Sequence, residues 1–135
     1  MTSAAAIPDF LAAHAAAWAA GDVEQVAEAM GLPQMLARGD GTVFIEDDRQ
    51  LDQWIEERLA DWHARGMVAV AATVRHVEEL PDDAARVTSD WRLADAAGAE
   101  VLAFTAVDTL AADEGEWYYV VTDLAGEDAA LAGRS

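Results

Sequence analysis

The stretch that decides the fold is ARVTSDWRLA, residues 85–94, because its apolar and polar side chains alternate. The two alternating sets are Val87, Ser89, Trp91 and Leu93 on one face, and Arg86, Thr88, Asp90 and Arg92 on the other. A two-residue period is typical of a strand with one buried face in an antiparallel sheet. We therefore expect Asp90 and Arg92 to lie on the outer face of the sheet, as surface or interface residues.

Three further strand-like segments flank this stretch. They are residues 67–79 before it, and residues 101–110 and 116–124 after it. Turn residues separate the segments, at 80–83, 97–99 and 113–116. The second half of the chain is therefore predicted to be four successive antiparallel strands. The alternation in 67–79 leaves open which of its faces points inward.

The first half of the chain reads as mostly helical. Apolar residues recur at helical spacing in the ranges 8–20, 22–30 and 47–65. Gly21 is expected to end the first helix and Asp22 to cap the second. Two short strands, 34–38 and 42–45, are predicted to form a hairpin between the second and third helices. The first eight residues and the tail from Ala125 to Ser135 are expected to be loose.

The length and composition bound the class of protein. A chain of 135 residues, 53% hydrophobic and 25% charged, is predicted to form one domain, with its core at about residues 8–124. The absence of Cys excludes disulfides, thiolate metal sites and cysteine nucleophiles. The chain has no basic leader and no run of roughly 18 apolar residues, so no membrane segment is expected. These features predict a soluble, cytoplasmic protein.

The charge balance narrows the partners. The net charge is −18, from 26 acidic and 8 basic residues, and every basic residue is Arg. A surface this acidic repels phosphate backbones and anionic lipids, so neither nucleic acid nor a membrane is an expected partner. The absence of Lys excludes Schiff-base chemistry on a side-chain amine. Three scattered His residues lack the spacing of a metal-binding helix, and no metal or cofactor is expected.

The order of these segments resembles the nuclear transport factor 2-like (NTF2-like) superfamily, in its SnoaL-like and ketosteroid-isomerase-like branches. The resemblance rests on Trp18 before Gly21-Asp22, the break at Pro33, the long third helix and the final strand opening at Gly115-Glu116-Trp117. It implies an α+β fold, in which a cone-shaped, curved, mostly antiparallel sheet wraps around three N-terminal-half helices and leaves a pocket. It also implies a homodimer through the outer sheet face, where Tyr119 and Val121 are expected.

The resemblance also shows where this chain departs from the steroid isomerases. Their oxyanion-binding Tyr stands seven residues before the Gly-Asp pair, and here that position is His14. Their general-base Asp lies on the strand after the second helix, whereas residues 35–38 here contain no carboxylate. Their second acid falls near Ala106, with Asp108 two residues further on. Steroid isomerisation by that mechanism is therefore not expected.

His14 and Asp108 are the candidate catalytic residues. His14 lies on the apolar stripe of the first helix, where an imidazole with an ordinary pKa near 6.5 can act as acid, base or hydrogen-bond donor. The alternative is a core histidine bonded to a backbone carbonyl or a water. Asp108 shares a strand face with apolar residues, and a buried carboxylate needs a partner, such as His14 or Arg38. The alternative places Asp108 in water at the sheet rim.

A second group of residues is predicted to contact a ligand. It comprises Trp18, Arg38, Trp54, Trp91 and Phe104. The aromatic rings suit a flat apolar molecule, such as a polyketide- or steroid-like compound, and the guanidinium suits a carboxylate. Alternatively the rings fill the core and the arginine is solvated.

Three functions stay open at this point. The first is an isomerase, dehydratase or cyclase that uses acid–base chemistry at an internal histidine. The second is a non-catalytic ligand-binding or dimerisation module. The third is a structural protein whose pocket has collapsed around its tryptophans.

Overall fold

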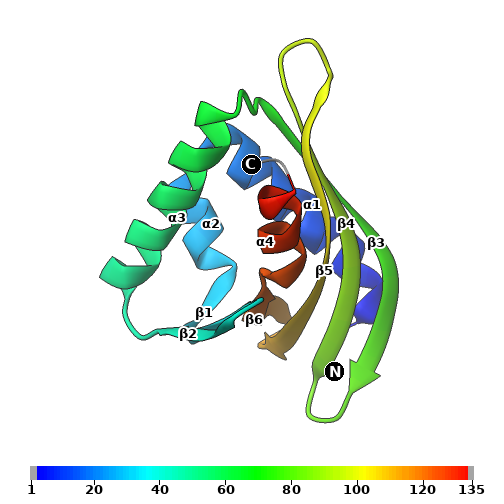
Figure 1. Ribbon diagram of the computed structural model, residues 1–135. Coiled ribbons are helices and arrows are strands. Elements are labelled where there is room, and N and C mark those ends of the chain that lie inside the picture. The colour runs from blue at the N-terminus through cyan, green and yellow to red at the C-terminus, as the bar shows by residue number, and fades with distance from the viewer. Residues whose placement is uncertain (1–2, 134–135) are drawn as a thin grey trace.

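The computed structural model describes residues 3–133 and contains one six-stranded sheet in the order β2-β1-β6-β5-β4-β3. The strands are β1 (Met30–Arg38), β2 (Gly41–Ile45), β3 (Ala69–Leu80), β4 (Ala84–Ala94), β5 (Glu100–Asp113) and β6 (Glu116–Asp123). Neighbouring strands run antiparallel except β1 and β6, which are parallel. The predicted α+β fold with a curved, mostly antiparallel sheet is confirmed, and the predicted hairpin is part of the same sheet (Figure 1).

The helices in the described residues are η1 (Ala4–Ala6), α1 (Ile7–Ala20), α2 (Val23–Glu28), α3 (Asp48–Ala64) and α4 (Ala125–Ala132). Gly21 ends α1 in the left-handed conformation, with φ of 69°, which glycine adopts without a Cβ clash. Asp22 and Asp47 cap α2 and α3 by accepting the backbone N–H bonds of Gln25 and Gln50. Among the described residues, no helix qualifies as a candidate transmembrane segment.

The C-terminal tail differs from its prediction, because residues 125–132 form the helix α4. In Figure 1, α4 lies between α3 and strand β5. Gly126 permits this close approach, since a Cβ built at this position would lie 2.2 Å from the Thr105 carbonyl oxygen. The predicted loose start also differs, because residues 4–6 form η1 and Ile7 is completely buried. Contacts with distant parts of the chain position residues 4–7 and α4, and local periodicity does not predict such contacts.

In β4 the buried and exposed residues alternate as predicted, whereas in β3 the alternation is interrupted. Val87, Ser89 and Leu93 are completely buried, whereas Arg92 is exposed, as predicted. In β3, the pairing with β4 shifts between Val74 and His76. This bulge restores Val77 to the core and leaves His76 exposed, so the inward set changes parity within the strand.

The prediction that Tyr119 lies on the outer sheet face is wrong. Tyr119 is buried, and its ring lies against those of Phe10 and His14. The pairing of β5 with β6 shifts by one residue between Tyr119 and Val121. Counted back from the buried Thr122, regular alternation would place Tyr119 outside. The extra residue turns it into the cone instead.

Candidate ligand-binding site

The imidazole of His14 is held inside the cone by α1. His14 is 6% exposed, and the Nε1–H of Trp18, one helical turn further on, donates to its Nε2 at 3.0 Å. An indole N–H can only donate, so Nε2 of His14 carries no proton. The neutral imidazole therefore carries its proton on Nδ1 and presents an N–H donor there.

That donor has no partner within residues 3–133. Nδ1 of His14 is buried and makes no hydrogen bond. Burial, and to a smaller extent the charge of Arg58, lowers the pKa of His14 from 6.5 to about 3. The ring is therefore neutral at physiological pH. It can donate a hydrogen bond to a ligand oxygen, and it is a poor proton acceptor.

Asp108, on β5, is the second buried polar group. It is 3% exposed, and its Oδ1 accepts the backbone N–H of Asp123 at 2.8 Å. Burial is the main cause that raises the pKa of Asp108 from 3.8 to about 7, and the nearby Asp123 charge adds to it. The backbone hydrogen bond and Arg58 oppose the rise. A large fraction of Asp108 is therefore protonated at neutral pH and can donate a hydrogen bond.

Tyr119, on β6, is the third buried polar group, and His14, Asp108 and Tyr119 together form the polar set of the site. The Tyr119 hydroxyl is buried and has no hydrogen-bond partner among residues 3–133, and burial raises the pKa of Tyr119 well above 10. Its ring centroid lies 4.8 Å from that of His14. His14, Asp108 and Tyr119 line one small cavity of about 20 Å³, together with Arg58, Trp91, Phe104, Ala106, Thr122 and Asp123. This volume has room for one water-sized group.

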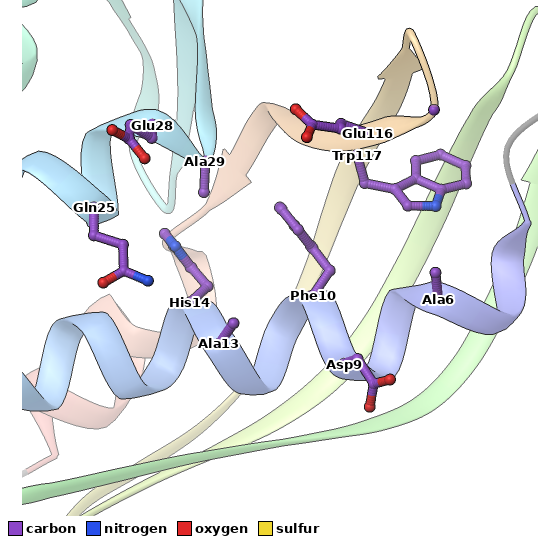
Figure 2. Close-up of a pocket in the computed structure, with 11 residues that line it drawn as sticks. Ala6, Asp9, Phe10, Ala13, His14, Gln25, Glu28, Ala29, Glu116 and Trp117 are labelled. Atoms are coloured by element: carbon purple, nitrogen blue, oxygen red, sulfur yellow. The ribbon is translucent and has the colours of Figure 1, made fainter.

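A larger groove lies on the other side of His14. It has a volume of about 450 Å³ and is bounded by α1, α2 and the turn between β5 and β6. Figure 2 shows Phe10 and His14 projecting from α1 on the same side, towards Ala29 and Trp117. The carboxylates of Asp9, Glu28 and Glu116 also line this groove. His14 is thus the wall shared by the open groove and the small cavity.

The structure divides the predicted site residues into two groups. Trp91 and Phe104 stack at 6.1 Å between centroids and line the small cavity, and Trp18 contacts His14 directly. Arg38 and Trp54 instead line a separate pocket of about 290 Å³ beside α4. Neither His14 nor Arg38, the two predicted partners of Asp108, donates a hydrogen bond to it. Trp18 engages His14, and Arg38 binds Asp128 at 2.7 Å.

Arg58 is the functional candidate that sequence reasoning missed. Its guanidinium carbon lies 4.8, 5.3 and 4.4 Å from the ring centroids of Trp18, Trp54 and Trp62. Arg58 lines both the small cavity and the pocket beside α4. The signal was present, because Trp54, Arg58 and Trp62 follow one another at four-residue spacing, which places the guanidinium on the inward stripe of α3.

The described part of the chain offers no metal centre. Residues 3–133 contain no group of three or more His, Cys, Asp or Glu side chains placed to hold an ion.

The family model described as NTF2-like protein (DUF6841) matches residues 4–125. The chain belongs to this NTF2-like family. The match includes α1, which carries His14, β5, which carries Asp108, and β6, which carries Tyr119.

Three solved structures with the same fold have low sequence identity to this chain. Aln2 from a Streptomyces species has a TM-score of 0.72 at 14% identity, covering 96% of this chain and 94% of its own. A protein of unknown function with a cystatin-like fold from Nostoc punctiforme has a TM-score of 0.69 at 16% identity, covering 90% and 91%. A ketosteroid isomerase-like protein from Erwinia carotovora atroseptica has a TM-score of 0.66 at 16% identity, covering 88% and 92%.

These similarities show the fold of this NTF2-like protein. Its chemistry has to be inferred from the residues of the site, because one fold serves many functions. No protein with a curated description matches the chain at a significant level.

Proposed function

We propose that this NTF2-like protein binds a small apolar molecule that carries a carbonyl oxygen, and that His14 polarises this oxygen while Asp108 transfers the α-proton for isomerisation, dehydration or cyclisation. The observation that carries the proposal is the Nδ1–H of His14. The hydrogen bond from Trp18 fixes this tautomer, and the described residues offer Nδ1 no partner.

The polar set is suited to a developing negative charge on oxygen. Neutral donors that are fixed in a dry site stabilise an enolate more strongly in the transition state than in the ground state. His14 donates to the ligand oxygen. Asp108, with a pKa of about 7, is partly ionised at neutral pH, so its carboxylate can take the α-proton as the enolate forms and return it as the acid. An unsatisfied buried donor costs about 1–3 kcal/mol. His14 and Tyr119 each carry such a group, so a ligand oxygen would relieve an existing cost.

The groove suits the body of such a ligand. Its volume of about 450 Å³ is in the range of small-molecule sites, and Phe10 and Trp117 supply apolar surface. Because His14 also lines the small cavity, a ligand in the groove can direct its oxygen towards the cavity at this residue. Phe10 stacks parallel to His14 at 6.3 Å between centroids and is the side chain that must turn to admit that oxygen.

One observation favours a second candidate, non-catalytic binding. Residues 35–38 of β1 carry no carboxylate, and Gln34 before them is bonded to the Tyr119 carbonyl at 2.8 Å and to Thr122 at 3.0 Å. Apart from Asp108, the carboxylate at the small cavity is Asp123, which already accepts the N–H groups of Val107 and Ala125. A binding protein would use the same donors to hold the carbonyl without removing a proton.

Deuterium exchange separates the two candidates. The enolisable ketone 2-tetralone is incubated with the protein in D₂O, and loss of its α-proton signals is followed by NMR. The proposal predicts exchange above the buffer rate, abolished by His14→Phe and retained by His63→Phe, a matched change of an exposed imidazole. Binding without exchange supports the non-catalytic candidate. If His14→Phe changes neither binding nor exchange, His14 is not part of the site.

A further inference from the structure

The C-terminal helix places a carboxylate inside the molecule. Glu127 of α4 is 5% exposed, although it is charged and close to the chain end. Arg58 donates to Glu127 from Nε at 3.1 Å and also from Nη2, and the Nε1–H of Trp62 donates to its other oxygen at 3.0 Å. Two side chains of α3 therefore surround one carboxylate with charged and neutral donors.

The donors themselves are held rigidly. The Arg58 side chain is 11% exposed and lies over three indole rings, while Trp18 and Trp62 are completely buried. A guanidinium fixed on aromatic faces loses little freedom when it binds a carboxylate, which favours a planar two-point contact. This is the arrangement of a carboxylate-binding site, and in this structure its occupant belongs to the chain itself.

We propose that Arg58 and Trp62 form a binding site for the carboxylate of a small, flat, apolar acid, and that Glu127 is an internal occupant which such a ligand displaces. This site shares Arg58 with the small cavity of the proposed function. It does not rest on that function, because the contacts that define it, from Arg58 and Trp62 to Glu127, do not include His14.

The surroundings of Arg58 fit such a ligand. The pocket of about 290 Å³ adjoins Arg58 and includes Trp54, Leu124 and Leu131 as apolar walls. Arg38 lines the same pocket and is paired with Asp128, the residue after Glu127. Arg58 and Arg38 are thus paired with Glu127 and Asp128, which are consecutive residues of the eight-residue helix α4.

The remaining charges restrict the ligand further. Glu57 and Asp61 also line the pocket, and the whole chain carries a net charge of −18. Like charges repel a second carboxylate or a phosphate, so the site favours a monocarboxylate.

The helix that carries Glu127 is short and follows the last strand. Such segments open with a smaller free energy than the core of a domain. A tethered carboxylate competes at an effective concentration on the order of millimolar or above. Removing its charge should therefore raise the affinity of Arg58 for a free carboxylate by about tenfold or more, which corresponds to about 1.4 kcal/mol or more.

Calorimetric titration with 2-naphthoate tests the site, with the neutral 2-naphthamide as the matched ligand. Glu127→Gln should bind 2-naphthoate at least about tenfold more tightly than the wild type, while naphthamide gains nothing. Asp128→Asn loosens the same helix but leaves Glu127 on Arg58, so it should change the affinity much less. Equal affinity of wild type and Glu127→Gln, or an equal gain for naphthamide, would overturn the proposal.

A second measurement uses the unmodified protein and does not depend on the folding of a variant. At saturating 2-naphthoate, hydrogen–deuterium exchange should become faster in residues 125–132 and stay unchanged in α3. If exchange in α4 is unchanged or slower, the ligand does not displace Glu127 and the proposal fails.

Discussion

A single indole hydrogen bond determines what His14 can do. Trp18 donates to Nε2, and this assigns the proton of the neutral ring to Nδ1. Burial lowers the pKa of His14 to about 3, so the ring keeps this form at neutral pH. In the steroid isomerases that the chain resembles, a tyrosine stands at this position, and here an imidazole N–H takes the place of its hydroxyl.

Replacement of Asp108 by Asn tests the buried acid through the pH dependence of stability. The native pKa of about 7 exceeds the ordinary value of 3.8, so the native state holds the proton more tightly. The free energy of unfolding contributed by Asp108 therefore falls as pH rises from 3.8 to about 7. Asn does not titrate, and Asp108→Asn should gain stability over the wild type across this window, by at most about 4 kcal/mol at pH 8.

Urea unfolding of both proteins at pH 3.5, 5 and 8 measures this difference. The contribution of His14 is common to both proteins and cancels in the comparison. A difference in unfolding free energy that is the same at all three pH values would show that Asp108 does not titrate in this range.

Tyr119→Phe separates ligand binding from stability. The hydroxyl of Tyr119 is buried, and the described part of the chain gives it no hydrogen-bond partner. Its removal should therefore leave the stability unchanged or raise it by about 1 kcal/mol. The same change should weaken binding of a carbonyl ligand. Thermal unfolding without ligand, followed by titration with 2-tetralone, measures both effects. A marked loss of stability in Tyr119→Phe would show that the hydroxyl has a structural partner.

At the scale of the element, α4 depends on one close contact. A Cβ on Gly126 would lie 2.2 Å from the Thr105 carbonyl oxygen, which is closer than any tolerated contact. Gly126→Ala should therefore undock α4 and cost about 1–3 kcal/mol. Gly133→Ala is the matched control, because its Cβ would lie 3.6 Å from the nearest atom. Unfolding by urea and amide exchange in residues 125–132 measure the effect. Equal behaviour of the two variants would contradict this account of the docking.

The sequence was most informative where an element obeys one period throughout. The alternation in residues 85–94 predicted the inner and outer faces of β4 correctly. It failed for Tyr119, where a bulge inserts a residue, because a bulge leaves no mark in the apolar pattern. The helix α4 was missed for a related reason, since its burial depends on Gly126 approaching a distant strand.

At the scale of the whole molecule, the fold could be predicted from the order of elements, whereas the polar site could not. The resemblance led to the NTF2-like family, and α1 correctly placed His14 inside. The hydrogen bond from Trp18 to His14 is local, but the lack of a partner for Nδ1 within residues 3–133 depends on the surrounding elements. The partner of Asp108 lies on another strand, and Trp18, which packs on Arg58, lies on another helix. Such contacts form only when different elements pack together, so a sequence pattern does not predict them.

We propose that the outer sheet face forms a homodimer around Val107, which is 42% exposed on β5. Light scattering coupled to gel filtration should give twice the chain mass of 14.4 kDa for the wild type, and the chain mass for Val107→Glu. A wild-type protein that elutes at the chain mass would contradict the dimer.

The central claim is that His14 is a neutral, buried donor through Nδ1, and ¹⁵N NMR of the imidazole tests it most directly. The account predicts a protonated Nδ1 and an unprotonated Nε2, with both signals unchanged between pH 8 and pH 5, because the pKa of His14 is about 3. A His14 ring that titrates near its ordinary pKa of 6.5, or that carries its proton on Nε2, would contradict the account.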